Sequence, residues 1–310
     1  MSTVLDIILP VFGLVFFGYL SGRAKWITEA GIEGLSSFVF TIAIPIMLFH
    51  SIATAELPEQ IPWNFIFAYY AMTLMLFAFC LAAGRLLGLD GTEASIFAMS
   101  GVYSNVVLLG IPLVLASLGE AATIPLFIIV STNAAILFLT TTFFAESGRG
   151  NTDKLQALPM QTVKVLASNQ IVLGIVLGLI TNLLNISLPG VIDKTAAFLG
   201  GAALPCAVFS IGASISRYKI SGEILRIATA LSIKNLAHPL LVWLACTHIF
   251  HLEPTWTAVA VVLAACPTGI NPYLFANRYQ VIVASTATVV VLSTAISVPV
   301  LSLVLVLLTN

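Results

Sequence analysis

Long apolar segments alternate with short polar ones along almost the whole chain. Each apolar segment is close to the length of about 20 residues that an α-helix needs to cross the hydrocarbon core of a bilayer. The pattern therefore predicts ten transmembrane helices. They lie near residues 4–22, 31–53, 62–87, 93–118, 122–145, 166–186, 191–215, 223–250, 255–277 and 281–308.

The fourth and the ninth of these segments contain residues that interrupt a helix. The interruption in the fourth segment covers Tyr103–Pro112 and includes Gly110 and Pro112. The interruption in the ninth includes Pro267, Gly269 and Pro272. Proline lacks a backbone N–H and clashes with the preceding helical turn. Unwound backbone is tolerated at membrane depth only where protein buries it or where it lines a water-filled cavity. We therefore expect two broken helices, and a binding site between them.

A polar stretch divides the segments into two sets of five. It covers residues 147–164 and is predicted to be a cytoplasmic linker between a first half, 1–146, and a second half, 165–310. An odd number of spans in each half gives the halves opposite orientations. Ile44–Phe49 also resembles Leu204–Phe209, so Pro45 and Pro205 are predicted to kink equivalent helices beside the crossing. The predicted fold class is an all-α polytopic membrane protein, with ten transmembrane helices as two inverted five-helix repeats and with broken, crossing helices 4 and 9.

Basic residues are distributed unevenly between the loops. Ten of the twelve fall after odd-numbered segments, and only Lys194 and Lys234 are left over. The positive-inside rule makes that side cytoplasmic and predicts that both termini are external. The ten residues are Arg23, Lys25, Arg85, Arg149, Lys154, Lys164, Arg217, Lys219, Arg226 and Arg278.

Composition agrees with a membrane protein and excludes other classes. Hydrophobic residues make up 59% of the chain and charged residues 8%, with a mean hydropathy of +1.08, whereas soluble domains carry roughly 25% charged residues. The net charge of −1 gives no support for nucleic-acid binding. All four cysteines lie in apolar segments, so no disulfide or metal site is inferred. The N-terminus lacks the positive region of a signal peptide, and the first segment is interpreted as a retained span.

The interruptions also predict an electrostatic preference. Asn271 before Pro272 has the pattern of an N-cap followed by a proline at the first helical position, and Gly110–Pro112 can start a half-helix in the same way. Because the two segments run antiparallel, both of these N-termini would face the bilayer midplane and favour an anion. Two helix C-terminal ends would also point inward, and their negative partial charge opposes the positive field of the N-termini. The sequence leaves the sign of the net field at the crossing open.

The candidate substrate-binding residues surround the interruptions. Lys234 lies deep in the eighth segment, where an ionisable side chain indicates function; it can attract an anion, snorkel to the cytoplasmic interface, or compensate helix C-terminal ends. Asn105 and Asn271 can bind a carboxylate, or they can form interhelical hydrogen bonds only. The full candidate set is Asn105, Asn271, Ser104, Thr268, Gly269, Lys234 and Tyr103.

Acidic residues are missing from the middle of every predicted span, so a carboxylate proton relay is not expected. The coupling ion, H⁺ or Na⁺, stays open, and sodium would have to use backbone carbonyls, amides and hydroxyls. His238, just before Pro239, is a further group that can titrate. No catalytic constellation is recognisable, so neither an enzyme nor a cofactor is predicted.

Three motifs resemble the auxin efflux carrier family, and most closely its short bacterial members that are described as malonate or other organic-acid transporters. They are Asn105 with Gly110–Pro112, Lys234 with Pro239, and Pro267–Pro272. The resemblance covers essentially the whole chain. It implies two inverted five-helix repeats, a scaffold part and a transport part, location in the bacterial cytoplasmic (inner) membrane, and a carboxylate held by asparagines that match Asn105 and Asn271. The central loop is short here, which argues against auxin as the substrate.

The expected function is secondary transport of small organic anions, mono- or dicarboxylates such as malonate, by alternating access. The alternatives are a sodium-coupled carrier of the bile-acid symporter type and a channel. The expected partners are the substrate and the lipid bilayer, and formation of a homodimer is left open.

Overall fold

Helices account for nearly all of the structure. The computed structural model describes residues 2–55, 57, 62–149, 160, 167–218 and 220–309; most of the predicted linker at 147–164 therefore lies outside the described residues. The described part is 84% helical and has no strands. The predicted all-helical class is thus confirmed.

The first half of the chain runs through seven α-helices and three shorter helical turns. In chain order these are α1 (Ser2–Arg23), α2 (Glu29–Phe38), η1 (Val39–Ala43), α3 (Ile44–Ala53), α4 (Trp63–Leu86), α5 (Gly91–Val102), η2 (Val106–Gly110), α6 (Ile111–Leu118), η3 (Glu120–Ala122) and α7 (Thr123–Gly148). The elements η1 and η2 are π-helical turns. η1 joins α2 to α3 without interruption, and η2 leads directly into α6.

The second half follows with a comparable set. Its elements are α9 (Gln170–Leu183), α10 (Gly190–Ile215), α11 (Ile224–Ser232), η4 (Ile233–Ala237), α12 (His238–Leu244), η5 (Ala245–Ile249), α13 (Pro254–Ala265), α14 (Asn271–Tyr279) and α15 (Val283–Thr309). Here η4 and η5 are again π-helical turns, so that residues 224–249 form one continuous helical run.

Within the residues that the structure describes, six helical runs are long and apolar enough to cross a membrane. They are Glu29–Ala53, Trp63–Leu86, Glu120–Gly148, Gly190–Ile215, Ile224–Ile249 and Val283–Leu308. Four further apolar helices are shorter, and two of these, Val106–Leu118 and Pro254–Ala265, adjoin the interruptions predicted from the sequence. The protein is therefore an integral membrane protein with multiple helices, whereas ten spans in two inverted repeats stay a prediction.

Three prolines follow π-helical turns. Pro45, Pro112 and Pro239 each occupy the second position of the helix that comes directly after η1, η2 or η4. A proline removes one N–H from the helical ladder and clashes with the turn before it, and a wider turn accommodates both effects. The expected half-helix start at Gly110–Pro112 is therefore wrong, because the helix is continuous from Val106 to Leu118. Pro205 lies inside α10.

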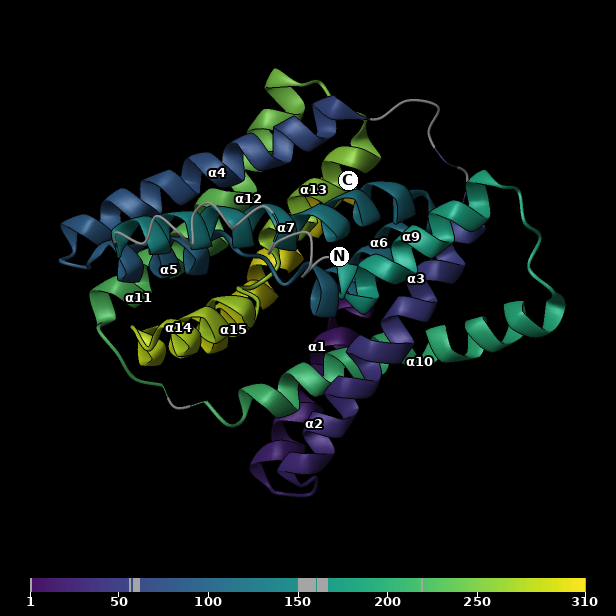
Figure 1. Ribbon diagram of the computed structural model, residues 1–310, viewed down its shortest axis with the longest axis horizontal. Coiled ribbons are helices and arrows are strands. Elements are labelled where there is room, and N and C mark those ends of the chain that lie inside the picture. The colour runs from purple at the N-terminus through teal and green to yellow at the C-terminus, as the bar shows by residue number, and fades with distance from the viewer. Residues whose placement is uncertain are drawn as a thin grey trace.

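Most helices fall into two groups, and α6 contacts members of both (Figure 1). Helices α1, α2–α3, α9 and α10 pack on one another and form the four-helix group at the lower right of the view. Helices α4, α5, α7 and α11–α15 form the second group, which extends to the left. Within the four-helix group α1 packs along α10 and α9 packs along α3.

Glycines permit these two close contacts. Gly18 of α1 lies against the backbone of Phe209 in α10, and Gly178 of α9 lies against the backbone of Phe49 in α3. A Cβ atom at either glycine would collide with a carbonyl oxygen, so only glycine allows the helices to approach this closely.

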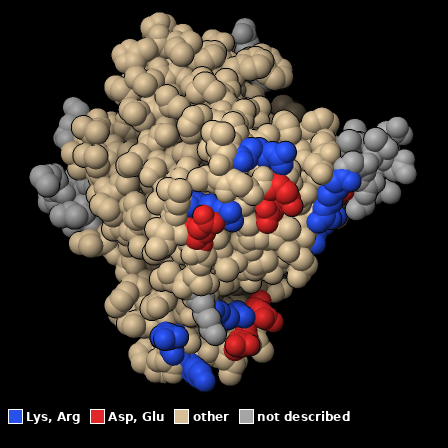
Figure 2. Space-filling model, turned by 90° about the vertical axis from the view of Figure 1, so that its left-hand side faces the viewer, with Lys and Arg blue, Asp and Glu red and all other residues tan. Residues whose placement is uncertain are grey.

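Charged side chains are few and scattered on the face that Figure 2 shows. Figure 2 views the structure from the left of Figure 1, and charged residues of both signs dot this face between uncharged surface. Many large apolar side chains are exposed, among them Phe79 and Phe198. Such a surface fits contact with lipid. Which side of the protein faces the cytoplasm stays a prediction.

Candidate functional site

The two interruptions pair with each other. The Asn105 N–H donates to the Pro267 carbonyl oxygen at 2.8 Å, and the Gly269 N–H donates to the Tyr103 carbonyl oxygen at 2.9 Å. Ser104 and Thr268 thereby form a short antiparallel bridge. Backbone groups that the breaks remove from the helical ladders are satisfied by one another, which permits unwound chain deep inside an apolar protein.

Sequence explains the second break better than the first. Cys266 ends α13 in an extended conformation, as expected for the residue before a proline, and α14 begins five residues later. The first break covers Tyr103–Asn105 and contains neither proline nor glycine. We attribute this break to its pairing with the second, since Tyr103 and Asn105 supply both hydrogen bonds.

The asparagines at the two breaks have different local roles. The Asn105 side-chain oxygen accepts from the Leu108 N–H at 3.3 Å, so Asn105 caps the helix that starts at Val106. Asn271 is the first residue of α14, Ile270 occupies the cap position, and the prediction that Asn271 is the N-cap is wrong. Its side-chain amide instead donates to the Tyr103 hydroxyl at 2.7 Å.

Carbonyl groups at the C-terminal ends of α5 and α13 are covered by protein donors. The Thr268 hydroxyl donates to the Ser100 carbonyl oxygen at 2.9 Å. The Lys234 Nζ donates to the Ala264 carbonyl oxygen at 2.6 Å. The C-terminal ends of α5 and α13 carry partial negative charge that would repel an anion. A hydrogen bond from a protein donor thus reduces that charge at each end.

Two neighbouring cavities open beside the paired breaks. One has a volume of about 280 Å³ and the other about 220 Å³. Five residues line both cavities and so mark where they adjoin: Phe40, Asn105, Leu108, Ile270 and Leu274. The N-terminal ends of η2 and α14 therefore face this space.

The predicted residues are distributed unevenly around it. Tyr103, Ser104, Gly269 and Asn271 line the larger cavity, Thr268 lines the smaller one, and Asn105 lines both. Lys234 lines neither cavity and is fully buried. The six residues predicted at breaks or crossings are also absent from both linings: Gly110, Pro112, Pro267, Pro272, Pro45 and Pro205.

Several lining residues were not predicted from the sequence. Ser210 and Ser214 lie one turn apart on α10, and Thr294 faces them from α15 across the smaller cavity. Hydroxyls repeated at helical spacing in an apolar helix are a signal that sequence reasoning can use. Phe40 belongs to the π-helical turn before Pro45, and Asn169 caps α9 at the edge of the larger cavity.

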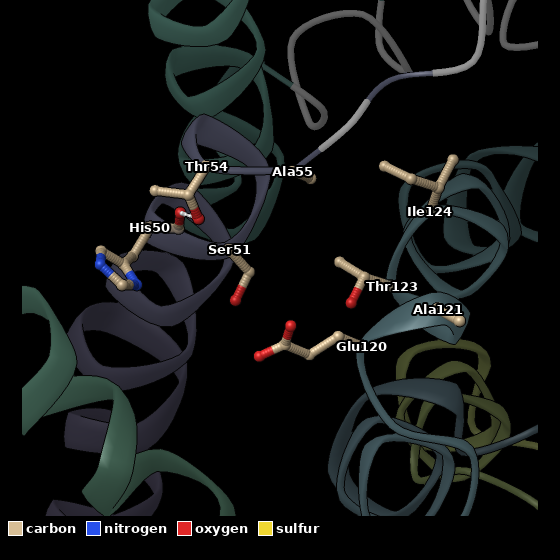
Figure 3. A pocket seen from close by; sticks show the side chains of 8 residues that line it. All are labelled: His50, Ser51, Thr54, Ala55, Glu120, Ala121, Thr123 and Ile124. Atoms are coloured by element: carbon tan, nitrogen blue, oxygen red, sulfur yellow. Dashed lines mark hydrogen bonds between the residues drawn. The ribbon is translucent and has the colours of Figure 1, made fainter. Parts of the chain in front are cut away.

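A larger cavity, about 610 Å³, lies elsewhere, between the end of α3 and the start of α7. Its lining shares no residue with the other two cavities. Figure 3 shows the Glu120 carboxylate extending into it toward Ser51. A carboxylate in this position disfavours an anion. Among the described residues no cluster of His, Cys, Asp and Glu could hold a metal ion.

Comparison with known proteins gives a match over nearly the full length. The family model described as membrane transport protein matches residues 3–305. A protein named "Putative malonate transporter" from Rhizobium meliloti is 26% identical over 299 residues, which are 96% of this chain and 93% of that protein. Auxin efflux carrier component 3a from Oryza sativa is 30% identical over 130 residues, 41% of this chain and 21% of that protein. The lysosomal cholesterol signaling protein of Mus musculus is 28% identical over 110 residues, 34% of this chain and 13% of that protein.

Proposed function

The chain belongs to the membrane transport protein family, the auxin efflux carrier family, and from this premise we propose that it is a secondary transporter of small organic anions. The substrate binds in the cavities beside the paired breaks. Asn105 and Asn271 offer their side-chain amides to a carboxylate, with Tyr103, Ser104, Thr268 and Gly269 around it.

One observation carries the proposal: the electrostatic asymmetry of the breaks. The N-terminal ends of η2 and α14 face the cavities, while the C-terminal carbonyls Ser100 and Ala264 are bonded to protein donors. Each helix N-terminus carries about half a positive charge and unpaired amide donors. The opposing field of the C-terminal ends is thereby reduced on the cavity side, so an anion is favoured there.

Size and similarity narrow the substrate class. The cavity that both asparagines line, about 280 Å³, lies at the small end of the range of roughly 300–1,000 Å³ that is common for drug-sized ligands. A small mono- or dicarboxylate suits it better than a large steroid-like anion. The relative that aligns over the whole chain carries a malonate transporter name, whereas the auxin carrier aligns over 41% of it.

The proposed mechanism is alternating access between two inverted five-helix repeats. Supporting this, the same spacing of 160 residues separates Gly18 from Gly178 and Phe49 from Phe209, and these residues make the two close helix contacts described above. The four-helix group would act as the scaffold and the second group would move against it. The bias of basic residues places both termini outside the bacterial inner membrane in this proposal.

The test is a thermal-shift screen of the purified protein against mono- and dicarboxylates, followed by flux assays in liposomes. A ligand that binds only the folded state raises the melting temperature in proportion to the logarithm of its concentration. We expect small dicarboxylates to stabilise the protein, and we expect internal substrate to accelerate uptake by exchange. Stabilisation by no carboxylate would contradict the proposal, and flux that neither saturates nor exchanges would indicate a channel.

A further inference from the structure

A lysine is buried deep in the second group. Lys234 lies in the π-helical turn η4, and its side chain is fully buried. Its Nζ donates to the Ala264 carbonyl oxygen, one residue before the end of α13. Among the described residues it forms no ion pair with a carboxylate. Its nearest acceptors are therefore a helix C-terminal carbonyl and an imidazole.

The hydrogen bonds around Lys234 form a chain through His238 to Thr73. The Thr73 hydroxyl donates to the Tyr69 carbonyl oxygen at 2.7 Å, so it accepts from Nε2 of His238 at 3.0 Å. A neutral His238 that donates through Nε2 has a free lone pair on Nδ1. That atom lies 3.4 Å from Nζ and accepts from Lys234. A protonated Lys234 that donates to both His238 and the Ala264 carbonyl oxygen fits this arrangement, and Thr73 holds His238 in position.

Among the described residues packed around Lys234, no carboxylate balances its charge. Helix α15, which packs against η4, has no ionisable side chain along its length. The charged residues of α5 and α11 lie in their first turns, where Glu93 bonds to the Asp90 N–H and Arg226 pairs with Glu223. On α4, Tyr69 faces the imidazole. The negative end of the α13 dipole is thus the main partner of the ammonium group.

The two broken helices differ in the group that donates a hydrogen bond to their C-terminal carbonyls. The C-terminal end of α5 is covered by the neutral hydroxyl of Thr268, while that of α13 is covered by a cation. Backbone carbonyl oxygens at such an end are also the ligands that a hard metal cation would need. A bound sodium ion would compete with Lys234 for the same end of α13.

We propose that Lys234 is a built-in counter-cation that takes the role of a coupling sodium ion, so that anion binding at the paired breaks requires no sodium. The inference rests on the proposed function and deepens it, because it separates this chain from sodium-coupled carriers. Lys234 acts as a positioning residue: it neutralises the end of α13 that would otherwise repel the substrate, and it does so without lining the cavity.

The experiment measures the affinity of a stabilising dicarboxylate, with malonate as the first probe, in sodium and in choline buffers. Wild-type affinity should be the same in both. Lys234→Met removes the charge at similar length, and it should weaken malonate binding by at least about ten-fold. Lys194→Met, at an exposed lysine on α10, is the matched control and should leave affinity unchanged. Lys234→Arg should retain more affinity than Lys234→Met because it keeps the charge.

Two results would overturn the inference: wild-type binding that needs sodium, or Lys234→Met binding malonate as tightly as the control. If Lys234→Met does not fold, Thr73→Val replaces it. This variant removes the hydroxyl that anchors His238, and it should weaken binding a few-fold in either buffer, whereas unchanged affinity would count against the proposal. Absence of binding by any carboxylate would instead refute the proposed function itself.

Discussion

The two breaks perform the same structural task with different residues, and the contrast shows where broken helices come from. The second break contains Pro267 and Gly269, and its position can be read from these residues. The first break, Tyr103–Asn105, contains no helix breaker and forms hydrogen bonds to the second. One local signal can therefore fix the geometry of two helices, because each break satisfies the backbone of the other.

The same contrast extends to the side chains. Asn105 caps its helix and lines both cavities, whereas Asn271 lies within its helix and is bonded to Tyr103. The C-terminal ends differ as well, with a hydroxyl at α5 and an ammonium group at α13. We expect substitutions at equivalent places in the two breaks to have unequal effects.

The largest effect is expected for Asn105→Asp. Aspartate is as good an N-cap as asparagine, so the cap on η2 and the stability of the fold should persist. The added negative charge beside the cavities should abolish binding of a carboxylate. Melting temperature and malonate affinity, measured on the same preparation, separate the two roles. Thr28→Asp, at the cap of α2, serves as the control, and retained binding in Asn105→Asp would place the anion elsewhere.

Asn271→Ala should have the next largest effect. A hydrogen bond to a charged group contributes about 1.5–3 kcal/mol, so loss of this donor should weaken anion affinity roughly ten- to a hundred-fold. The fold should be less affected, because Asn271 does not cap α14. Tyr103→Phe is the paired variant: it removes the present partner of Asn271 but leaves the amide, and it should change affinity little. Equal losses in both variants would show that their mutual hydrogen bond matters and not the anion contact.

Thr268→Val should act on stability more than on affinity. Valine has the shape of threonine but cannot donate to the Ser100 carbonyl oxygen, which leaves a buried acceptor without its donor. The expected cost is about 1–3 kcal/mol of unfolding free energy, read as a lower melting temperature. Ser302→Ala, which removes a hydroxyl bonded within α15, controls for loss of a hydroxyl in general. If the melting temperature of Thr268→Val equals that of this control, the hydrogen bond from Thr268 to the C-terminal end of α5 does not stabilise the fold.

Much of the fold could be predicted from hydropathy, while the details of the site depended on contacts. Segment lengths and composition predict the all-helical membrane class, because apolar runs report burial in lipid directly. The depth of Lys234 in its helix was also apparent, but its hydrogen bond to Ala264 joins residues 30 positions apart. The fourth segment was predicted to be interrupted within Tyr103–Pro112, but no proline or glycine marked the exact place of the break, because its cause lies in the other half of the chain.

Prolines were the least reliable guide. Pro112 looked like the start of a half-helix, yet a π-helical turn carries the helix through it, as also happens at Pro45 and Pro239. Pro267, in contrast, ends a helix. The difference is that the Pro267 carbonyl oxygen and the Gly269 N–H find hydrogen-bond partners in the other break, so unwinding there costs less. Contact of Asn105 and Asn271 with substrate stays a prediction.

The most direct test of the central claim is an experimental structure of the protein with a bound dicarboxylate. The account predicts that a carboxylate group lies between the N-terminal ends of η2 and α14, within about 2.7–3.2 Å of the side-chain amides of Asn105 and Asn271. A carboxylate bound in the cavity beside Glu120, or against Lys234 with both asparagines out of reach, would contradict it.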